Sequence, residues 1–515
     1  MQKNLILAVV LSSLVYVGWY TFVEKKIQPQ RQQAAQQQAQ AASPQAQAPA
    51  QPAYPAAQAE PAPLPANWKD KAIKIKAGKA EYTFNAETAS LASAVYQGPV
   101  APVELVPDPQ RGFFYASFPG KFTLKSKTEK SVEFVSQQGP LRITKKFTFT
   151  PENGVNYLEM EAVNTSGSSQ ALAPWELRIG PGLDTVESEM KENKSELKAV
   201  YTFSETGRKH PTLKEVEDDE PARHDWVWAG LSNRYFLAAF ASPSFKDTRP
   251  IRRDEKVGEN DETPLLAVPM RGVELKPGEK IAWTTLFYLG PKDYALLQKV
   301  GLGLDRAVDF GFFAPLAKLA NSSLIYFYKA TGNYGVAIII LSVIIQLLLT
   351  PLSFKSYKAM AVMKKIQPEM QAIQKRYKED PQRMNKEIMD LYKRHGTNPL
   401  GGCLPMLLQI PVFFALFTAL RNSWDLHGAA FVFWIKDLSS KDPFYVMPLV
   451  MGGIMFLQQH LSPQTSDPAQ ATMMKFMPLI FTFMFLTFPS GLVLYWLINS
   501  TWGFAQTMYL QKKMG

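Results

Sequence analysis

Cysteine is nearly absent from this chain of 515 residues, which contains a single one, Cys403. One cysteine excludes an internal disulfide bond. Any large domain of this chain that lies in an oxidising compartment must therefore be stable through core packing alone, which its size permits.

Signatures of catalysis and of metal binding are also lacking. We find no Ser/His/Asp order, no phosphate-binding loop and no paired carboxylates within an apolar segment. Cys403 has no basic neighbour in the sequence, so we interpret it as a small packing residue. The histidines are scattered without the spacing of metal ligands, at His210, His224, His395, His427 and His460. The sequence therefore predicts no enzyme, no catalytic residue, no metal site and no cofactor.

The length of the chain exceeds what one hydrophobic core usually fills, so we expect at least two domains. Hydrophobic residues make up 46% of the sequence, and they gather towards both ends and leave the middle polar. The net charge is +11. A basic balance of this kind favours nucleic acid or anionic lipid as a partner, and the positions of the charges decide between them.

The amino-terminal part predicts a membrane anchor and a linker. Lys3 precedes an apolar run over 5–23 that is longer than a typical signal-peptide core, and no small-residue cleavage site follows it directly. We interpret residues 1–27 as an uncleaved signal-anchor helix with its amino terminus in the cytoplasm. Residues 28–66 consist mainly of Gln, Ala and Pro, a composition too poor in large apolar groups to fold, and predict a flexible linker.

Residues 67–291 show the period of two that is typical of β-strands. The turn signal of residues 151–154 (Pro-Glu-Asn-Gly) predicts a hairpin. Repeated hairpins predict an antiparallel β-sandwich with one solvated face on each sheet. A scaffold or docking domain is the simplest interpretation, because no cluster of polar and aromatic residues identifies a glycan or peptide ligand. The alternating apolar residues are Ile73 and Ile75, Phe122 and Leu124, Phe147 and Phe149, and Leu158, Met160 and Ala162.

Residues 292–333 predict an amphipathic helix at the membrane surface, with Phe312, Leu316 and Leu319 on one face and an interruption at Pro315. This helix leads into a predicted membrane helix over 334–357.

Three polar residues within this apolar helix, Ser342, Gln346 and Thr350, follow one another at intervals of four. On a helix they form one stripe, which must face protein or water because an unpaired amide in hydrocarbon costs roughly 1 to 3 kcal/mol. Two interpretations remain open: hydrogen bonds to neighbouring helices, or a wet groove that faces a substrate.

Residues 358–398 form a basic segment that predicts a cytoplasmic location by the positive-inside rule, and this places the sandwich outside the cytoplasm. A heptad-like spacing of apolar residues, broken at Asp380-Pro381, predicts a helical hairpin. The hairpin is either a solvated charged arm or a docking arm for an anionic partner such as the ribosome or signal recognition particle RNA. The candidate docking residues are Lys364, Lys365, Lys375, Arg376, Lys378, Lys393 and Arg394.

Residues 399–515 contain four further apolar segments, which gives six predicted crossings with both termini in the cytoplasm. Several motifs here resemble the YidC/Oxa/Alb membrane protein insertases, and the linker and large outer domain resemble the Gram-negative bacterial members. The motifs are Asn398-Pro399-Leu400-Gly401-Gly402-Cys403, Gln409-Ile410-Pro411, Trp434-Ile435-Lys436-Asp437-Leu438, Leu461-Ser462-Pro463 and Pro489-Ser490-Gly491-Leu492-Val493-Leu494-Tyr495-Trp496.

This resemblance implies an α-helical inner-membrane protein with a periplasmic β-sandwich. Five helices would surround a hydrophilic groove that opens to the cytoplasm and to lipid. Nascent membrane proteins would enter it alone or from the Sec translocon, with the ribosome and signal recognition particle pathway as further partners. Apart from these no sequence-specific nucleic acid is expected. The insertion step needs no ATP, because burial of the apolar segment contributes about 25 cal/mol for each Å².

The resemblance also identifies candidate groove and exit residues. The candidate groove residues are Ser342, Gln346, Thr350, Gln409, Arg421, Tyr495 and Trp496, and phenylalanines of the third and fifth crossings would form the surface along which a substrate helix leaves, namely Phe413, Phe414, Phe417, Phe481 and Phe485. Ordinary packing remains an alternative for each of these aromatic residues.

The chain departs from the family pattern at Gln346, where bacterial members usually carry an arginine, one turn after the small hydroxyl residue that Ser342 matches. Glutamine keeps hydrogen-bond donors but not the charge. Either the groove is an uncharged polar cavity or the charge has moved to Arg421, whose depth along the third crossing favours a snorkelling residue near the outer surface.

Two functions outside this family compete with an insertase. A transporter or channel is one, although the crossings show no internal repeat. A structural envelope protein that binds glycan through the sandwich is the other. Deletion of the sandwich discriminates the latter, because an insertase would keep most of its activity.

Overall fold

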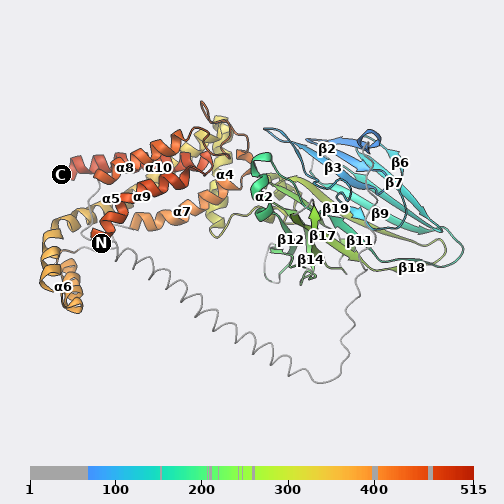
Figure 1. Cartoon of the computed structure of the whole chain (residues 1–515), viewed down its shortest axis with the longest axis horizontal. Helices are drawn as coiled ribbons and strands as arrows, with labels where there is room; N and C mark the ends of the chain where they lie inside the picture. Colours follow the sequence, from blue (N-terminus) through green and yellow to red (C-terminus); the bar gives the residue numbers. More distant parts are fainter. Residues whose placement is uncertain are drawn as a thin grey trace, which may run out of the picture. The chain divides into compact units, whose positions relative to one another are not determined.

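The computed structural model describes residues 68–150, 154–205, 207, 211–218, 220–241, 243–245, 248–257, 261–396, 404–461 and 468–514. The predicted signal anchor and the predicted linker lie outside these residues, and so does the motif from Asn398 to Cys403. A β-sheet region comes first along the chain and a helical region follows (Figure 1).

The sheets are antiparallel throughout. The largest has nine strands in the order β13 (Thr212–Glu215), β12 (Lys198–Phe203), β14 (Trp226–Ser232), β15 (Phe236–Ala241), β19 (Lys280–Pro291), β9 (Asn156–Asn164), β8 (Leu141–Thr148), β7 (Ser131–Gln138) and β6 (Thr123–Lys127). Two four-stranded sheets have the orders β1 (Ile73–Ala77), β2 (Ala80–Asn85), β3 (Ser90–Gln97), β4 (Pro102–Glu104), and β16 (Ile251–Val257), β17 (Asp261–Met270), β11 (Trp175–Ile179), β5 (Tyr115–Ala116). A two-stranded sheet joins β10 (Gln170–Leu172) to β18 (Val273–Leu275).

One hydrophobic core joins the inner faces of the three larger sheets. Phe84 of β2 packs against Phe147 of β8 at 4.8 Å between ring centroids, and Phe147 packs against Phe287 of β19. Such aromatic pairs add roughly 0.5 to 1.5 kcal/mol each beyond the area that they bury. The predicted antiparallel β-sandwich is thus confirmed, as is the hairpin that joins β8 to β9.

The predicted alternation is wrong at Leu124, and one inward position holds a lysine for which no prediction was made. Leu124, predicted to point inward with Phe122, is exposed, because β6 is the edge strand of its sheet and its register shifts between Leu124 and Ser126. Lys145 points inward between Ile143 and Phe147 and is fully buried. Its ammonium donates a hydrogen bond to the carbonyl oxygen of Phe114 at 2.5 Å.

The buried Lys145 predicts a pH-dependent stability. Desolvation lowers the pKa of Lys145 from 10.5 to about 7. Between these two values the unfolded chain binds a proton that the folded chain does not, so the stability of the sandwich should rise as the pH rises from about 7 to about 10.5. Replacing the lysine by methionine should remove this slope and stabilise the sandwich at neutral pH by roughly 1 to 4 kcal/mol.

Tryptophan-monitored unfolding of the full chain at pH 7 and pH 9 would measure both effects. Lys146→Met is the matched control, because Lys146 is the next residue of β8 and its side chain is 43% exposed and pairs with Glu159 at the surface. An unchanged pH slope in Lys145→Met would show that Lys145 does not cause it.

The chain leaves the sheets through three helical pieces: α3 (Tyr294–Val300), η4 (Leu304–Ala307) and α4 (Ala314–Thr331). Pro315 lies in the first turn of α4, where its missing N–H costs nothing, so it starts a helix rather than interrupting one. The predicted apolar face of α4 is exposed, and Phe312 just before the helix is 93% exposed. The opposite face, with Ala317 and Leu324, is buried against the helices that follow.

The helix α5 runs without a break over Tyr334–Arg376, past Pro351 and Pro368. Its carboxy-terminal part packs along α6 (Pro381–Arg394) through the predicted apolar seam, in which Ile366, Met370 and Leu391 are buried. Asp380 ends the turn between the two helices, because its carboxylate accepts a hydrogen bond from the Arg383 backbone at 3.0 Å. One arm of the hairpin is therefore a continuation of the predicted membrane helix.

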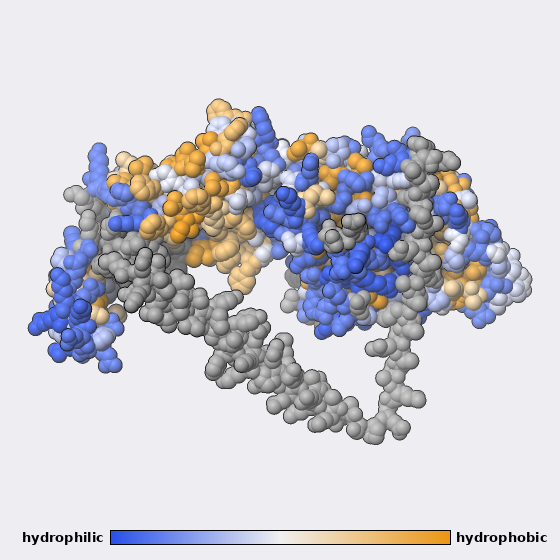
Figure 2. All heavy atoms as spheres, viewed as in Figure 1, coloured by the Kyte–Doolittle hydropathy of each residue, from blue (hydrophilic) through white to orange (hydrophobic). Residues whose placement is uncertain are grey.

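Four helices complete the chain: α7 (Leu404–Arg421), α8 (Val446–Leu461), α9 (Pro468–Phe485) and α10 (Ser490–Met514). The sheet region also contains the short 3-10 helices η1 (Trp68–Lys71), η2 (Glu187–Glu189) and η3 (Pro243–Phe245), and the helix α2 (Met190–Glu196) follows η2. A further 3-10 helix, η6 (Trp424–Leu426), follows α7. Apolar side chains gather over the helical region, whereas α6 carries a polar surface (Figure 2).

Within the described residues, the segment Tyr334–Met363 of α5 is long and apolar enough to cross a membrane. Shorter apolar stretches occur at Leu408–Arg421, Val446–Leu461 and Lys475–Phe485. The six crossings stay a prediction.

Candidate functional site

A polar cavity of about 370 Å³ lies among α5, α7, α8 and α10. It is lined by five side-chain carboxamides and several hydroxyls, and none of the described residues that line it is charged. The lining residues are Gln346, Leu349, Ser353, Ser356, Tyr357, Gln409, Met455, Gln458, Trp496, Asn499, Ser500, Gly503, Gln506, Thr507 and Leu510. A polar space of this size holds several water molecules.

Of the three residues of the predicted stripe of α5, Gln346 lines this cavity, and Thr350 contacts the lining residue Gln506. The amide of Gln346 donates a hydrogen bond to Asn499 Oδ1 of α10 at 2.6 Å. The hydroxyl of Thr350 accepts one from Gln506 Nε2 at 2.7 Å and donates to the Gln346 carbonyl oxygen. Ser342 lies one turn away, fully buried, and its hydroxyl donates to the Ile338 carbonyl oxygen at 2.6 Å. Gln346 and Thr350 thus face α10, and neither Thr350 nor Ser342 is among the residues that line the cavity.

Gln409 and Tyr495 join α7 to α10 on another wall. Gln409 Nε2 donates a hydrogen bond to the Tyr495 hydroxyl at 2.5 Å, and Tyr495 is buried. Because Gln409 lines the cavity while Tyr495 lies behind it, the tyrosine holds the amide in place.

Trp496 lies at the boundary between the cavity and a cluster of aromatic rings. Its indole packs against Phe413, Phe481 and Phe485, with ring centroids 5.0, 5.5 and 5.2 Å away. Phe417 joins the cluster through Phe488 at 5.9 Å. The structure therefore brings four of the five predicted exit phenylalanines together.

Phe414 is the fifth of these phenylalanines, and half of its side chain is exposed. It contacts the cluster only through Phe413 among the described ring pairs.

Arg421 lies outside the cavity, at the end of α7. Its guanidinium pairs with Glu196 of α2 at 2.6 Å, and its carbonyl oxygen accepts two hydrogen bonds from Arg234. This ion pair holds the side chain against the sheet region, and Arg421 is not among the residues that line the cavity. The location of Arg421 near the outer surface of the membrane stays a prediction.

The candidate docking residues lie along the hairpin of α5 and α6, except Lys378, which lies in the turn between these helices. The side chains of Lys365, Lys375, Arg376, Lys378, Lys393 and Arg394 are exposed, and Lys364 also belongs to α5. Their cations outnumber the nearby carboxylates, of which Asp390 pairs with Lys393 at 3.7 Å.

The sequence analysis missed most of the cavity wall contributed by α10. Asn499, Gly503 and Thr507 are spaced by four residues, and Ser500, Gly503 and Gln506 by three, which places all five on one face of a helix. This spacing was a usable signal. Among the described residues, no group of three or more His, Cys, Asp or Glu side chains could hold a metal ion.

Comparisons with known proteins agree with this arrangement. Residues 90–320 match the model of the YidC periplasmic domain, and residues 326–515 match that of the 60Kd inner membrane protein family. The membrane protein insertase YidC of Endomicrobium trichonymphae is 42% identical over 422 residues, covering 79% of this chain and 78% of that protein. The insertase YidC of Geobacter metallireducens is 39% identical and covers 76% of this chain and 71% of that one.

A crystal structure of an active YidC insertase with its first transmembrane domain resolved aligns with a TM-score of 0.40 and 20% identity, covering 85% of this chain and 92% of that one. On the family models and the sequence relatives, this is an inner-membrane protein with a periplasmic β-sandwich and a helical carboxy-terminal region. The chain belongs to the YidC family of membrane protein insertases.

Proposed function

We propose that the uncharged polar cavity receives the hydrophilic segment of a nascent membrane protein during insertion. The observation that carries this proposal is the set of five carboxamides within helices that are otherwise apolar. A polar or charged residue at the bilayer centre costs roughly 2.5 to 3.5 kcal/mol on insertion scales. A hydrated cavity part of the way across lowers this cost, and no bond is made or broken, so the protein acts without catalytic residues.

The carboxamides suit this task because each offers both donors and an acceptor. An extended polypeptide in the cavity presents unpaired N–H and C=O groups, which are costly in lipid. Gln346, Gln409 and Asn499 can exchange their present hydrogen bonds for bonds to such a segment. The apolar part of the substrate would then leave along the aromatic cluster, since Trp496 borders both surfaces.

The rest of the proposal concerns topology and partners. Six crossings would leave both termini in the cytoplasm, where the basic hairpin could contact the ribosome or the signal recognition particle RNA through its exposed cations. Cooperation with the Sec translocon rests on the family resemblance.

Photo-crosslinking tests the position of the substrate. A photoreactive residue at Gln346 should label ribosome-stalled chains of a small membrane protein, because Gln346 lines the cavity. The same residue at Ile344 is the matched control, since Ile344 lies on the same helix, does not line the cavity and is 39% exposed. Labelling of lipid or neighbouring helices alone from both positions would contradict the proposal and leave the stripe a structural feature.

A further inference from the structure

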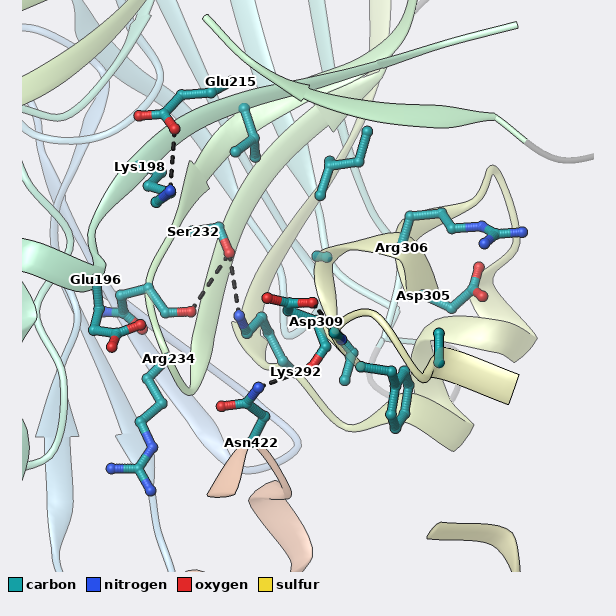
Figure 3. A pocket seen from close by; sticks show the side chains of 18 of the residues that line it. Glu196, Lys198, Glu215, Ser232, Arg234, Lys292, Asp305, Arg306, Asp309 and Asn422 are labelled. Carbon is teal, nitrogen blue, oxygen red and sulfur yellow. Dashed lines mark hydrogen bonds and ion pairs between the residues drawn. The ribbon is translucent and has the colours of Figure 1, made fainter. Parts of the chain in front are cut away.

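A second and larger cavity, of about 680 Å³, lies where the sheet region meets the helical region. Its wall is formed by β12, β13, the β14–β15 turn, η4, the first turns of α4 and the end of α7. Figure 3 shows Lys292 in the middle of the lining residues, with Arg234 and Arg306 on opposite sides of it. The site described above uses none of these residues.

Basic side chains outnumber acidic ones in this wall. Seven lysines and arginines and four carboxylates line the cavity, a net charge of +3. Several of the cations are neutralised locally: Arg421 pairs with Glu196 at 2.6 Å and Lys198 with Glu215 at 3.1 Å. Arg234 pairs with Glu189, which lies behind the wall, at 2.6 Å.

Lys292 is not neutralised in this way. Its side chain is 7% exposed, and its ammonium makes one long hydrogen bond, 3.4 Å to Ser232 Oγ, in the described part of the chain. Asp309 and Glu196 act on it only from beyond ion-pair distance, and burial lowers the pKa of Lys292 to about 8. Buried cations are normally paired, so the ammonium of Lys292 points to a missing anion.

We propose that this cavity binds a phosphate group, with Lys292 as its principal ligand. Phosphate oxygens accept several charge-assisted hydrogen bonds, which ammonium and guanidinium groups supply. The hydroxyl of Ser232 lies within reach of the same ammonium.

The position of the cavity favours the headgroup of an anionic phospholipid as the source of this phosphate. Gly311, Ala314 and Lys318 line the cavity, whereas Phe312 and Leu319 of the same segment are exposed apolar side chains. Such a pattern is typical of a helix at the membrane surface, where lipid phosphates lie. The identification of lipid thus rests on the membrane orientation proposed above, but the phosphate site itself does not.

Binding to the full-length protein in detergent tests the site, with short-chain phosphatidylglycerol and inorganic phosphate as separate probes. Lys292→Met should weaken binding of the preferred probe at least about tenfold, the loss expected for one charged hydrogen-bond donor. Lys329→Met is the matched control, because Lys329 is an exposed lysine at the other end of α4. Preferential binding of phosphatidylglycerol would support the lipid source, and equal binding of inorganic phosphate would support the site with a free anion as its ligand.

Two further variants separate binding from folding. Lys292→Met should raise the melting temperature of the probe-free protein, because it removes a buried charge without a partner. Asp309→Asn should strengthen binding, because it removes a negative charge from the wall. The proposal is overturned if neither probe binds, or if Lys292→Met binds as tightly as the original protein. A fall in melting temperature in Asp309→Asn without stronger binding would also overturn it, by showing that Lys292 serves as the partner of Asp309.

Discussion

Replacement of Gln346 by leucine should lower the insertion rate of a substrate with a short polar tail by at least about fivefold. The change removes the 2.6 Å hydrogen bond to Asn499 and leaves that amide facing an apolar group. A buried polar group without its partner costs roughly 1 to 3 kcal/mol, which corresponds to a factor of about 5 to 150 in rate if the cost falls on the substrate-bound state. The initial rate of insertion into proteoliposomes would measure it.

Leu348→Ala is the control for this experiment. Leu348 lies on α5 two residues from Gln346 and is 75% exposed, so its truncation should change the rate less than about twofold, in line with other exposed positions. A similar loss in both variants would show that the helix, rather than the cavity, limits insertion.

Charged replacements of Gln346 test whether the absence of charge in the cavity determines which substrates are inserted. Gln346→Arg keeps donors towards Asn499 and adds a positive charge, so it should favour substrates with acidic tails. Gln346→Glu should favour basic tails, because opposite charges attract strongly where water is scarce. The original protein should treat matched acidic and basic tails alike, since no charged residue lines the cavity.

The polar stripe of α5 illustrates which features of this site can be predicted from the sequence and which cannot. The spacing of Ser342, Gln346 and Thr350 depends only on the period of a helix, so the common face of these residues could be predicted. Their partners could not be identified in the same way. Asn499 and Gln506 lie more than 150 positions away in the sequence, and their selection depends on which helices pack together.

Several differences between the predicted and the observed structure lie at prolines and at single charged residues. The sequence predicts a membrane helix over 334–357, but α5 passes Pro351 and Pro368 and continues to Arg376, because a proline removes one hydrogen bond and a helix that is held by its neighbours tolerates the loss. The burial of Lys145 could not be predicted from the pattern of strand β8 alone, because lysines are rarely buried without a partner. The ion pair of Arg421 with Glu196 depends on tertiary contact across 225 positions.

Gly452 of α8 should tolerate no larger residue. An alanine Cβ at this position would lie 2.0 Å from Thr482 Oγ1 of α9, and the threonine hydroxyl is held by a 2.7 Å hydrogen bond to the Pro478 carbonyl oxygen. Overpacking of this kind costs roughly 1 to 3 kcal/mol or more. Gly452→Val should therefore lower the melting temperature and the insertion rate together, because α8 also carries Gln458 of the cavity wall.

Gly453 provides a control on the same helix. A Cβ there would meet nothing within 4 Å, so Gly453→Ala should be neutral or stabilise the helix by up to about 1 kcal/mol.

Thr482→Ala removes the atom that a Cβ at position 452 would contact first, so it should recover part of the stability lost in Gly452→Ala. A double-mutant cycle would give the coupling energy between the two positions. Equal behaviour of the two glycines would contradict the close packing of α8 on α9. Recovery of insertion together with stability would show that this small contact keeps the polar wall of the cavity in place.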